Sequence, residues 1–134
     1  MAVDPGSKRV GLALSDPLGI IAQPLKTILA QPSSTLAQRL AQIAREEQAE
    51  SVVVGLPKRL DGGVGDEATA ARALAEKLRH LGLKVELMDE RLSSRQAERE
   101  LIRAGESRAR RRQVTDVVAA ALILQSYLES RHGR

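Results

Sequence analysis

Apolar residues in the first third of the chain alternate or cluster over short stretches, a pattern typical of β-strands. Turn signals, "DPGSK" and "DPLG", separate three such stretches: "MAVD" at residues 1–4, "RVGLALSD" at Arg9–Asp16 and "GIIAQPLKTI" at Gly19–Ile28. Short connections of this kind join neighbouring antiparallel strands. The pattern therefore predicts a three-stranded meander, and Pro24 places the third strand at an edge of the sheet.

The apolar period then becomes helical, and helices alternate with strands for the rest of the chain. The predicted elements are a helix over Ser34–Gln48, a strand over Ser51–Pro57, a helix over residues 66–81, a strand over Leu83–Asp89, and helices from Ser93 or Ser94 to about Ala104 and from about Val114 to Ser130. Ser33, Ser34 or Thr35 is the expected N-cap of the first helix. The order βββαβαβαα predicts an α/β fold in which two parallel strands extend the meander, with sites at the carboxyl ends of the parallel strands.

Composition narrows the kind of site. The 134 residues fit a single domain over 1–134, and they include no Cys, no Phe, no Trp and one Tyr, Tyr127. Disulfides and thiolate metal sites are therefore excluded, and base stacking on aromatic rings is disfavoured. The sequence shows no signal-like segment and no apolar run near 18 residues, so we expect a cytoplasmic protein without a membrane partner.

Carboxylates stand at the ends of predicted elements. Asp4 ends the first strand, Asp89 and Glu90 end the last, and Asp116 interrupts the apolar run "VTDVVAAALIL" near the predicted start of the final helix. If the two strands are neighbours, these acids meet at one sheet edge, where their mutual repulsion favours bound Mg²⁺ or Mn²⁺. Paired ions of this kind can activate water and stabilise the leaving oxygen of a phosphodiester.

Structural roles are the alternative for each acid taken singly. Asp4 could begin a turn in "DPG", Asp89 and Glu90 could cap the loop that follows their strand, and Asp116 could favour the positive end of the helix macrodipole. Only their joint placement favours a metal site.

Four segments, "VDPGSKRVGLALSDPLGIIAQPL", "VVVGLPKRLDG", "MDERLSS" with "QAE" after it, and "DVVAAALILQSYL", resemble the YqgF family, also called RuvX, in order and spacing. The resemblance implies a ribonuclease H-like fold related to the RuvC resolvases, with a five-stranded mixed sheet of three antiparallel and then two parallel strands, flanked by helices. It implies that Asp4, Glu90 and Asp116 are the catalytic metal ligands, with Asp89 as an alternative ligand. For Asp16, which ends the second strand, a structural turn is the expected role.

Basic residues supply the expected contacts with phosphate. The net charge of +4 and a pI of about 10 favour an anionic partner. The candidate nucleic-acid-binding residues are Lys8, Arg9, Lys58, Arg59, Arg91, Arg108, Arg110, Arg111 and Arg112. The alternatives are a surface turn for "KRLDGG" and a solvated connection before the last helix for "SRARRRQ".

The resemblance implies a metal-dependent endonuclease of the two-metal-ion type that leaves a 5′-phosphate and a 3′-hydroxyl. Two substrates are implied: the 5′ end of the 16S ribosomal RNA precursor, or a Holliday junction in DNA. A non-catalytic factor that binds RNA or the ribosome is the alternative. A homodimer would suit the junction, which needs two coordinated cuts, and a monomer would suit the RNA.

Overall fold

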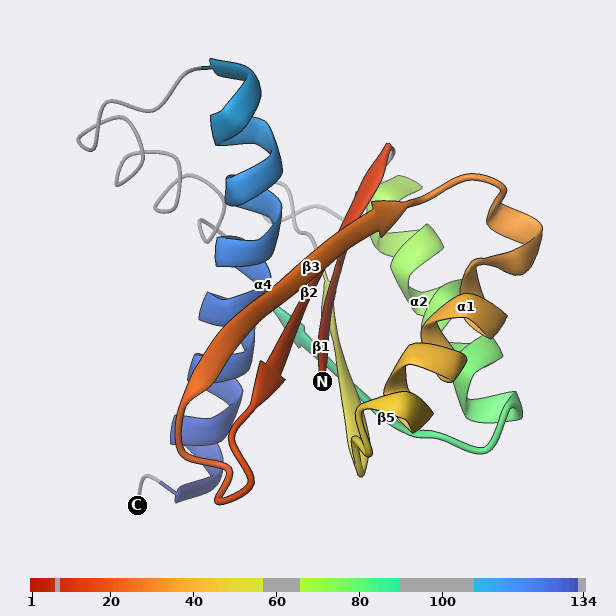
Figure 1. Cartoon of the computed structure of the whole chain (residues 1–134). Coiled ribbons are helices and arrows are strands. Elements are labelled where there is room, and N and C mark those ends of the chain that lie inside the picture. Colours follow the sequence, from red (N-terminus) through yellow and green to blue (C-terminus); the bar gives the residue numbers. More distant parts are fainter. Residues whose placement is uncertain (7, 57–65, 90–107, 133–134) are drawn as a thin grey trace.

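A computed structural model describes residues 1–6, 8–56, 66–89 and 108–132 of the chain (Figure 1). One sheet, in the order β3-β2-β1-β4-β5, contains strands β1 (Ala2–Pro5), β2 (Arg9–Ser15), β3 (Ala22–Leu29), β4 (Ser51–Leu56) and β5 (Lys84–Asp89). Strands β1, β2 and β3 pair antiparallel, and β4 and β5 extend the sheet in parallel from β1. The predicted five-stranded mixed sheet is therefore confirmed.

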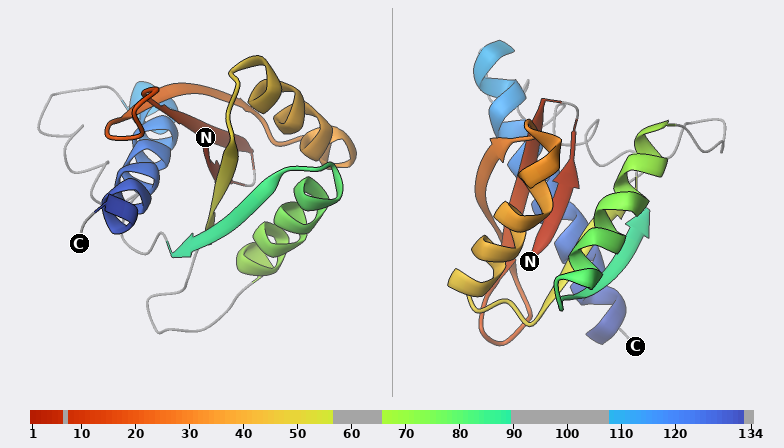
Figure 2. Two further views of the ribbon diagram at one scale, coloured as in Figure 1. Left: turned by 90° about the horizontal axis from the view of Figure 1, so that it is seen from below. Right: turned by 90° about the vertical axis from the view of Figure 1, so that its right-hand side faces the viewer.

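Helices cover both faces of the sheet, as Figures 1 and 2 show. Helices α1 (Ser33–Glu46) and α2 (Asp66–His80) lie on one face, and α4 (Arg108–His132) lies on the other. Strand alternation divides the apolar residues between the two layers. On β4, Val52 and Val54 join the core under α1 and α2, whereas Val53 joins the core under α4.

Strand β4 is an inner strand of the sheet and lies between β1 and β5. All five residues from Val52 to Leu56 are buried, because helices cover both faces of the strand. Full burial of each valine side chain stabilises the fold by roughly 1.5–3 kcal/mol. Because β4 pairs in parallel with both β1 and β5, the carboxyl ends of these strands lie at the same end of the sheet.

Strand β3 forms an edge, as Pro24 predicts. Leu12 pairs with Lys26 and Ala13 with Pro24, so Leu25 is an additional residue that makes a bulge in β3. A proline and a bulge both interrupt the ladder that an exposed edge would otherwise offer to another strand.

Helix α4 begins six residues earlier than the sequence predicts, at Arg108 instead of about Val114. The prediction of a polar connection over the arginine run was wrong. Arginine is a strong helix former, and residues 108–114 contain neither Gly nor Pro, so charge alone does not stop the helix there. The buried residues of α4 include Ala120, Ile123, Leu124 and Leu128, which pack on the sheet.

Two boundaries near the third strand also differ from the prediction. Pro32 is the N-cap of α1, so the expected Ser or Thr cap was wrong, and the Ser33 N–H donates instead to Gln31 Oε1 at 3.2 Å. Strand β3 begins at Ala22, not Gly19, because residues 17–21 form a loop. In this loop, two backbone N–H groups donate hydrogen bonds to the side chain of Asp16, the residue that follows β2.

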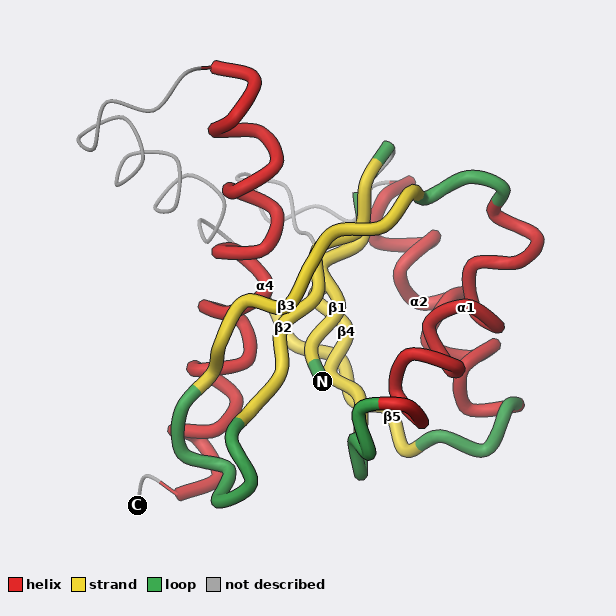
Figure 3. Tube along the Cα trace, viewed as in Figure 1, coloured by secondary structure: helices red, strands yellow, loops and turns green. Residues whose placement is uncertain are grey.

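The remaining strand and helix predictions agree with the structure to within about two residues, the usual uncertainty of element ends. Figure 3 separates these strands from the helices on either side of them. The predicted helix from Ser93 or Ser94 to Ala104 lies outside the described residues. Among the helices that are described, none has the length and hydropathy needed to cross a bilayer.

Candidate functional site

Asp4 lies in β1, directly at the carboxyl end of the strand, and its side chain belongs to the α4 face of the sheet. Its neighbour Ala2, two residues away, packs in the α4 core, whereas Val3 packs under α1 and α2. Among the described charged residues, Asp4 is the buried one, at 8% exposure. Asp4 pairs with Gly11 of β2 instead of opening a turn, so the turn-forming alternative is wrong.

Gly11 allows α4 to approach the sheet at this point. A Cβ atom on Gly11 would overlap the carbonyl group of Asp116 and would lie 3.1 Å from Asp116 Cβ. A side chain of any size at position 11 would therefore push the helix away. The absence of a side chain in the middle of β2 is what seats Asp116 on the sheet beside Asp4.

The close approach brings two of the predicted acids together. Cβ positions of paired residues on antiparallel strands are about 4.5–5.5 Å apart, so Asp4 Cβ and Asp116 Cβ lie within about 9 Å of each other. Asp116 stands eight residues inside α4, beyond the first turn. The capping alternative for Asp116 is therefore wrong, because the macrodipole acts mainly within the first turn.

Arg9 holds the carboxylate of Asp116. Its Nε donates a hydrogen bond to Asp116 Oδ2 at 2.7 Å, which joins β2 to α4 across 107 residues of sequence. Arg9 lies two residues before Gly11 and so on the same face of β2. The two side chains are 29% and 26% exposed, so the pair contributes about 0–1 kcal/mol to stability, and its main effect is to orient the carboxylate.

The third predicted ligand, Glu90, lies outside the described residues. Strand β5, which leads to it, is not a neighbour of β1, since β4 lies between them and places β1 and β5 about 10 Å apart. Asp89 ends β5 on the face of α1 and α2, because Val85 and Leu87 pack there and Met88 packs against the α4 core. Asp89 therefore faces away from Asp4, and within the described ranges no three Asp, Glu or His side chains cluster.

Asp16 has the structural role that its sequence context predicts. Its Oδ1 accepts hydrogen bonds from the backbone N–H groups of Ile20 at 2.7 Å and Ile21 at 2.8 Å. These bonds close the β2–β3 loop. Asp16 is five residues from Gly11 along β2, or roughly 17 Å, so it cannot share an ion with Asp4.

The predicted basic residues fall into three groups. Lys8 is exposed in the turn between β1 and β2, near Asp4 in the sequence. Arg9 forms an ion pair with Asp116. The first turns of α4, four to eight residues before Asp116, contain Arg108, Arg110, Arg111 and Arg112. Lys58, Arg59 and Arg91 lie outside the described residues. Contact of all these residues with nucleic acid stays a prediction.

Gly11 and the Arg9–Asp116 pair are features of the candidate site that the sequence analysis did not predict. A glycine inside the strand "RVGLALS" is a signal for a close backbone approach, and it could have located the helix contact. The ion pair leaves no such signal, because its partners are 107 residues apart. Two carboxylates and one guanidinium thus share the carboxyl end of β1, an arrangement of hard oxygen donors with an excess negative charge.

The sequence and the fold of the chain also match those of known proteins. The sequence model of RuvX, described as Holliday junction resolvase, matches residues 1–130. Relatives named "putative pre-16S rRNA nuclease" include those of Pelotomaculum thermopropionicum, 47% identical over 97% of this chain and 86% of the relative, and Symbiobacterium thermophilum, 47% identical over 98% and 92%. Thermus thermophilus RuvC shares the fold, with a TM-score of 0.55 and 15% identity, over 98% of this chain and 94% of RuvC. A structure of the same RuvC in complex with a Holliday junction substrate also has a TM-score of 0.55, with 17% identity over 98% of this chain and 93% of that one.

Proposed function

The chain belongs to the RuvX family, and from this premise we propose that it is a nuclease that hydrolyses phosphodiester bonds in structured nucleic acid. The observation that carries the proposal is the seating of Asp116 over Gly11, next to buried Asp4. A helix is brought unusually close to a strand there, and the contact serves to place two carboxylates together. A purely structural contact would not need two acids near the end of a central strand, since like charges repel.

The donor set suits a hard divalent cation, Mg²⁺ or Mn²⁺. Asp4 and Asp116 offer carboxylate oxygens. The chain has no Cys, and among the described residues no His joins these two acids to favour a softer ion. Glu90 is the third ligand that the family resemblance implies. When bound, a pair of such ions would supply Lewis acidity and a more acidic water for the attack on phosphorus.

The chain's own residues would position the reacting groups. Burial restricts the side chain of Asp4, and the bond from Arg9 fixes which oxygen of Asp116 faces the guanidinium. The positive charge of Arg9 also offsets part of the repulsion between the two carboxylates. Lys8, exposed in the adjacent turn, would bind a phosphate next to the cleaved bond.

The substrate favoured by the relatives' names is the 16S ribosomal RNA precursor. The family resemblance implies a cut at its 5′ end. The second candidate is a Holliday junction, which the description of the family and the RuvC complex favour. A junction resolvase would act as a homodimer, because two strands must be cut in a coordinated way. A single trimming cut requires one site only.

The test is cleavage of both substrates by the wild type, Asp4→Asn and Asp116→Asn with Mg²⁺ or Mn²⁺. Asparagine keeps the shape of aspartate and removes its charge, so we expect both variants to fold and to lose at least about a hundredfold in rate. Asp16→Asn is the matched control at the other end of β2 and should cut within about twofold of the wild type. The substrate that the wild type cleaves faster identifies the reaction.

Wild-type rates in Asp4→Asn would contradict the assignment of the site. Salt-dependent RNA binding by a wild type that cuts neither substrate would instead support the non-catalytic factor. Sedimentation under the same conditions would add the oligomeric state, with a dimer favouring the junction.

A further inference from the structure

The end of the sheet opposite Asp4 carries exposed apolar side chains on an ordered loop. In the β2–β3 loop, Leu18 is 76% exposed, Ile20 is 54% exposed and Ile21 is 55% exposed. The loop lies beside the C-terminal end of α4 in Figure 1. Grouped apolar side chains of this size are uncommon on a free surface, and they mark sites of contact with another molecule.

Two side chains hold this loop in place. Asp16 binds the N–H groups of Ile20 and Ile21, and Gln125 of α4 grips the loop from the other side. Gln125 Oε1 accepts from the Ala22 N–H at 2.9 Å, and Gln125 Nε2 donates to the Ile20 carbonyl at 3.0 Å. The apolar residues are thus held outward by the fold, which lowers the entropy that a partner would have to remove on binding.

An open pocket of about 920 Å³ adjoins the loop and extends the surface. We call it the distal pocket; its walls are the β2–β3 loop, the turn between α1 and β4, the start of β5 and the end of α4. Tyr127, the one aromatic residue of the chain, lines it, along with Leu18 and Leu128. The Tyr127 hydroxyl bonds to Glu86, and Arg131 lies 5.6 Å from the centre of its ring, so the ring is fixed.

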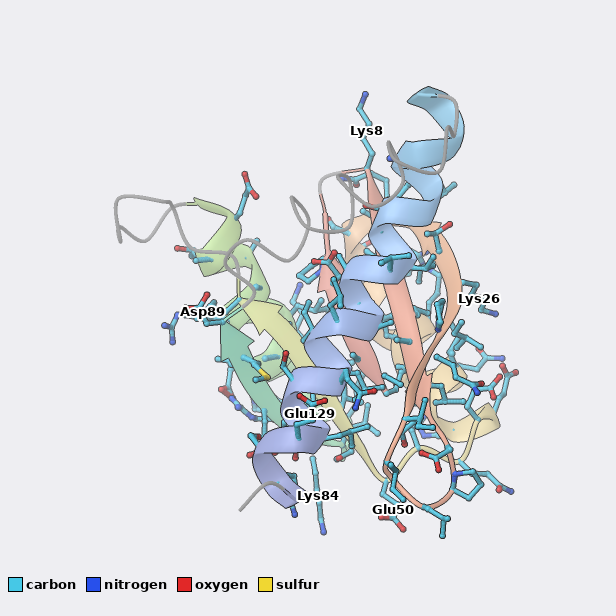
Figure 4. All side chains as sticks on the ribbon, turned by 90° about the vertical axis from the view of Figure 1, so that its left-hand side faces the viewer. Lys8, Lys26, Glu50, Lys84, Asp89 and Glu129 are labelled. Carbon is cyan, nitrogen blue, oxygen red and sulfur yellow. The ribbon has the colours of Figure 1, made fainter. Side chains whose placement is uncertain are left out.

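The charge of the distal pocket is opposite to that of the chain. Among the described residues, its lining side chains include four acids, Asp16, Glu47, Glu50 and Glu86, and two bases, Lys84 and Arg131, whereas the chain as a whole carries +4. In Figure 4, Glu50 and Lys84 lie at one end of the molecule and Lys8 lies at the other. An acidic rim repels nucleic acid and attracts cationic groups.

We infer that the β2–β3 loop and the distal pocket form a docking surface for a protein segment that carries apolar side chains flanked by Lys or Arg. The apolar loop supplies the desolvated centre, Tyr127 an aromatic wall and the acids a complementary rim, which is the usual anatomy of a protein interface. Asp116 and Tyr127 are eleven residues apart on α4, about 16 Å, so a partner bound here leaves the carboxylate site open. The inference does not depend on the nuclease proposal.

A library of random linear peptides, selected on the full chain and counter-selected on Leu18→Ser/Ile20→Ser, tests the surface. We expect the selected peptides to combine Leu, Ile or aromatic residues with Lys or Arg. Titration calorimetry should show that they bind the double variant at least tenfold more weakly. Glu47→Lys/Glu50→Lys should weaken them similarly.

Leu29→Ser is the matched control, because Leu29 is 68% exposed at the far end of β3. This variant should bind the peptides like the wild type, and circular dichroism should show all variants folded. Selected peptides that lack basic residues, or that bind the double variant equally well, would overturn the inference. So would self-association of the wild type that Leu18→Ser/Ile20→Ser abolishes, since the occupant would then be a second copy of the chain.

Discussion

Gly11 leaves no space for a side chain between β2 and α4, and this sets the position of Asp116. Gly11→Ala places a Cβ where the Asp116 carbonyl now lies, and the backbone of a helix cannot give way locally. We expect a loss of about 1–3 kcal/mol in the free energy of unfolding and a loss of most nuclease activity. Urea denaturation and a cleavage assay measure the two effects.

Gly82→Ala is the control for this prediction. Gly82 follows α2 at φ +92°, and a Cβ there would meet open space. The substitution costs about 1–2 kcal/mol through backbone strain alone. We expect Gly82→Ala to be destabilised by a comparable amount but to keep normal activity. Full activity in Gly11→Ala would show that the present position of Asp116 against β2 is not needed for cleavage.

Arg9 is a positioning residue in this site, and its substitution separates two roles. Arg9→Gln removes the bond to Asp116 Oδ2 and leaves a polar side chain. If Arg9 orients Asp116, kcat should fall by about ten- to a hundredfold while KM for nucleic acid stays the same, since a small misplacement is costly to the chemical step. A rise in KM alone, with a shallower salt dependence, would show that Arg9 binds phosphate instead.

At the scale of elements, the β2–β3 loop depends on an ionised carboxylate. The Ile21 N–H, and to a lesser extent the Ile20 N–H, lower the pKa of Asp16 below its ordinary value. The charged form therefore stabilises the fold fully above the unfolded-state pKa of about 3.9, and this contribution disappears as the pH falls through the lower folded-state pKa.

The variant Asp16→Asn tests that contribution. It keeps an acceptor but not the charge, so the difference in urea midpoint between it and the wild type should be present at about pH 6 and shrink at about pH 2.5. Asp16→Ala loses the acceptor as well and should be less stable at both pH values. A difference that does not change with pH would contradict the role of the charge.

The elements themselves are largely predictable because their periodicity is local. The buried face of α2 is the one that the spacing of Ala68, Ala71 and Leu74 predicts. Boundaries failed where a distant or competing interaction decided them. Asp16 accepts hydrogen bonds from the N–H groups that would have begun β3. Residues Arg108–Arg112 extend α4 because arginine is a strong helix former.

At the scale of the whole molecule, lysines at opposite ends of the sheet allow a test of where nucleic acid binds. Lys8 lies at the end that carries the acids, and Lys84 lies at the opposite end (Figure 4). Lys8→Gln should weaken binding to RNA or junction DNA and reduce the slope of log K against log[salt] by about 1. Lys84→Gln removes the same charge far from the site and should leave both unchanged, as binding titrations at several salt concentrations would show.

The site was predictable only in part, because sequence shows where strands end but not which strands are neighbours. Asp4 and Asp116 lie near each other because Gly11, a residue with no functional group, lets α4 approach β2 closely. Asp89 failed as an alternative because strand alternation turns it to the other face. The order β1-β4-β5, which separates Asp4 from the end of β5, follows from the crossover connections and not from any motif.

Helix α4 carries Asp116 near one end of the sheet and Tyr127 near the other. The number of residues between the two is constrained more strictly than the identity of those residues. Eleven residues from Asp116 to Tyr127 make about three turns and return to within about 20° of the same side. Inserting or deleting one residue between them would rotate one end by about 100° against the other, so either Asp116 would leave Gly11 or Tyr127 would leave Glu86. Substitutions on the outer side of α4 are therefore tolerable where a single-codon insertion or deletion is not.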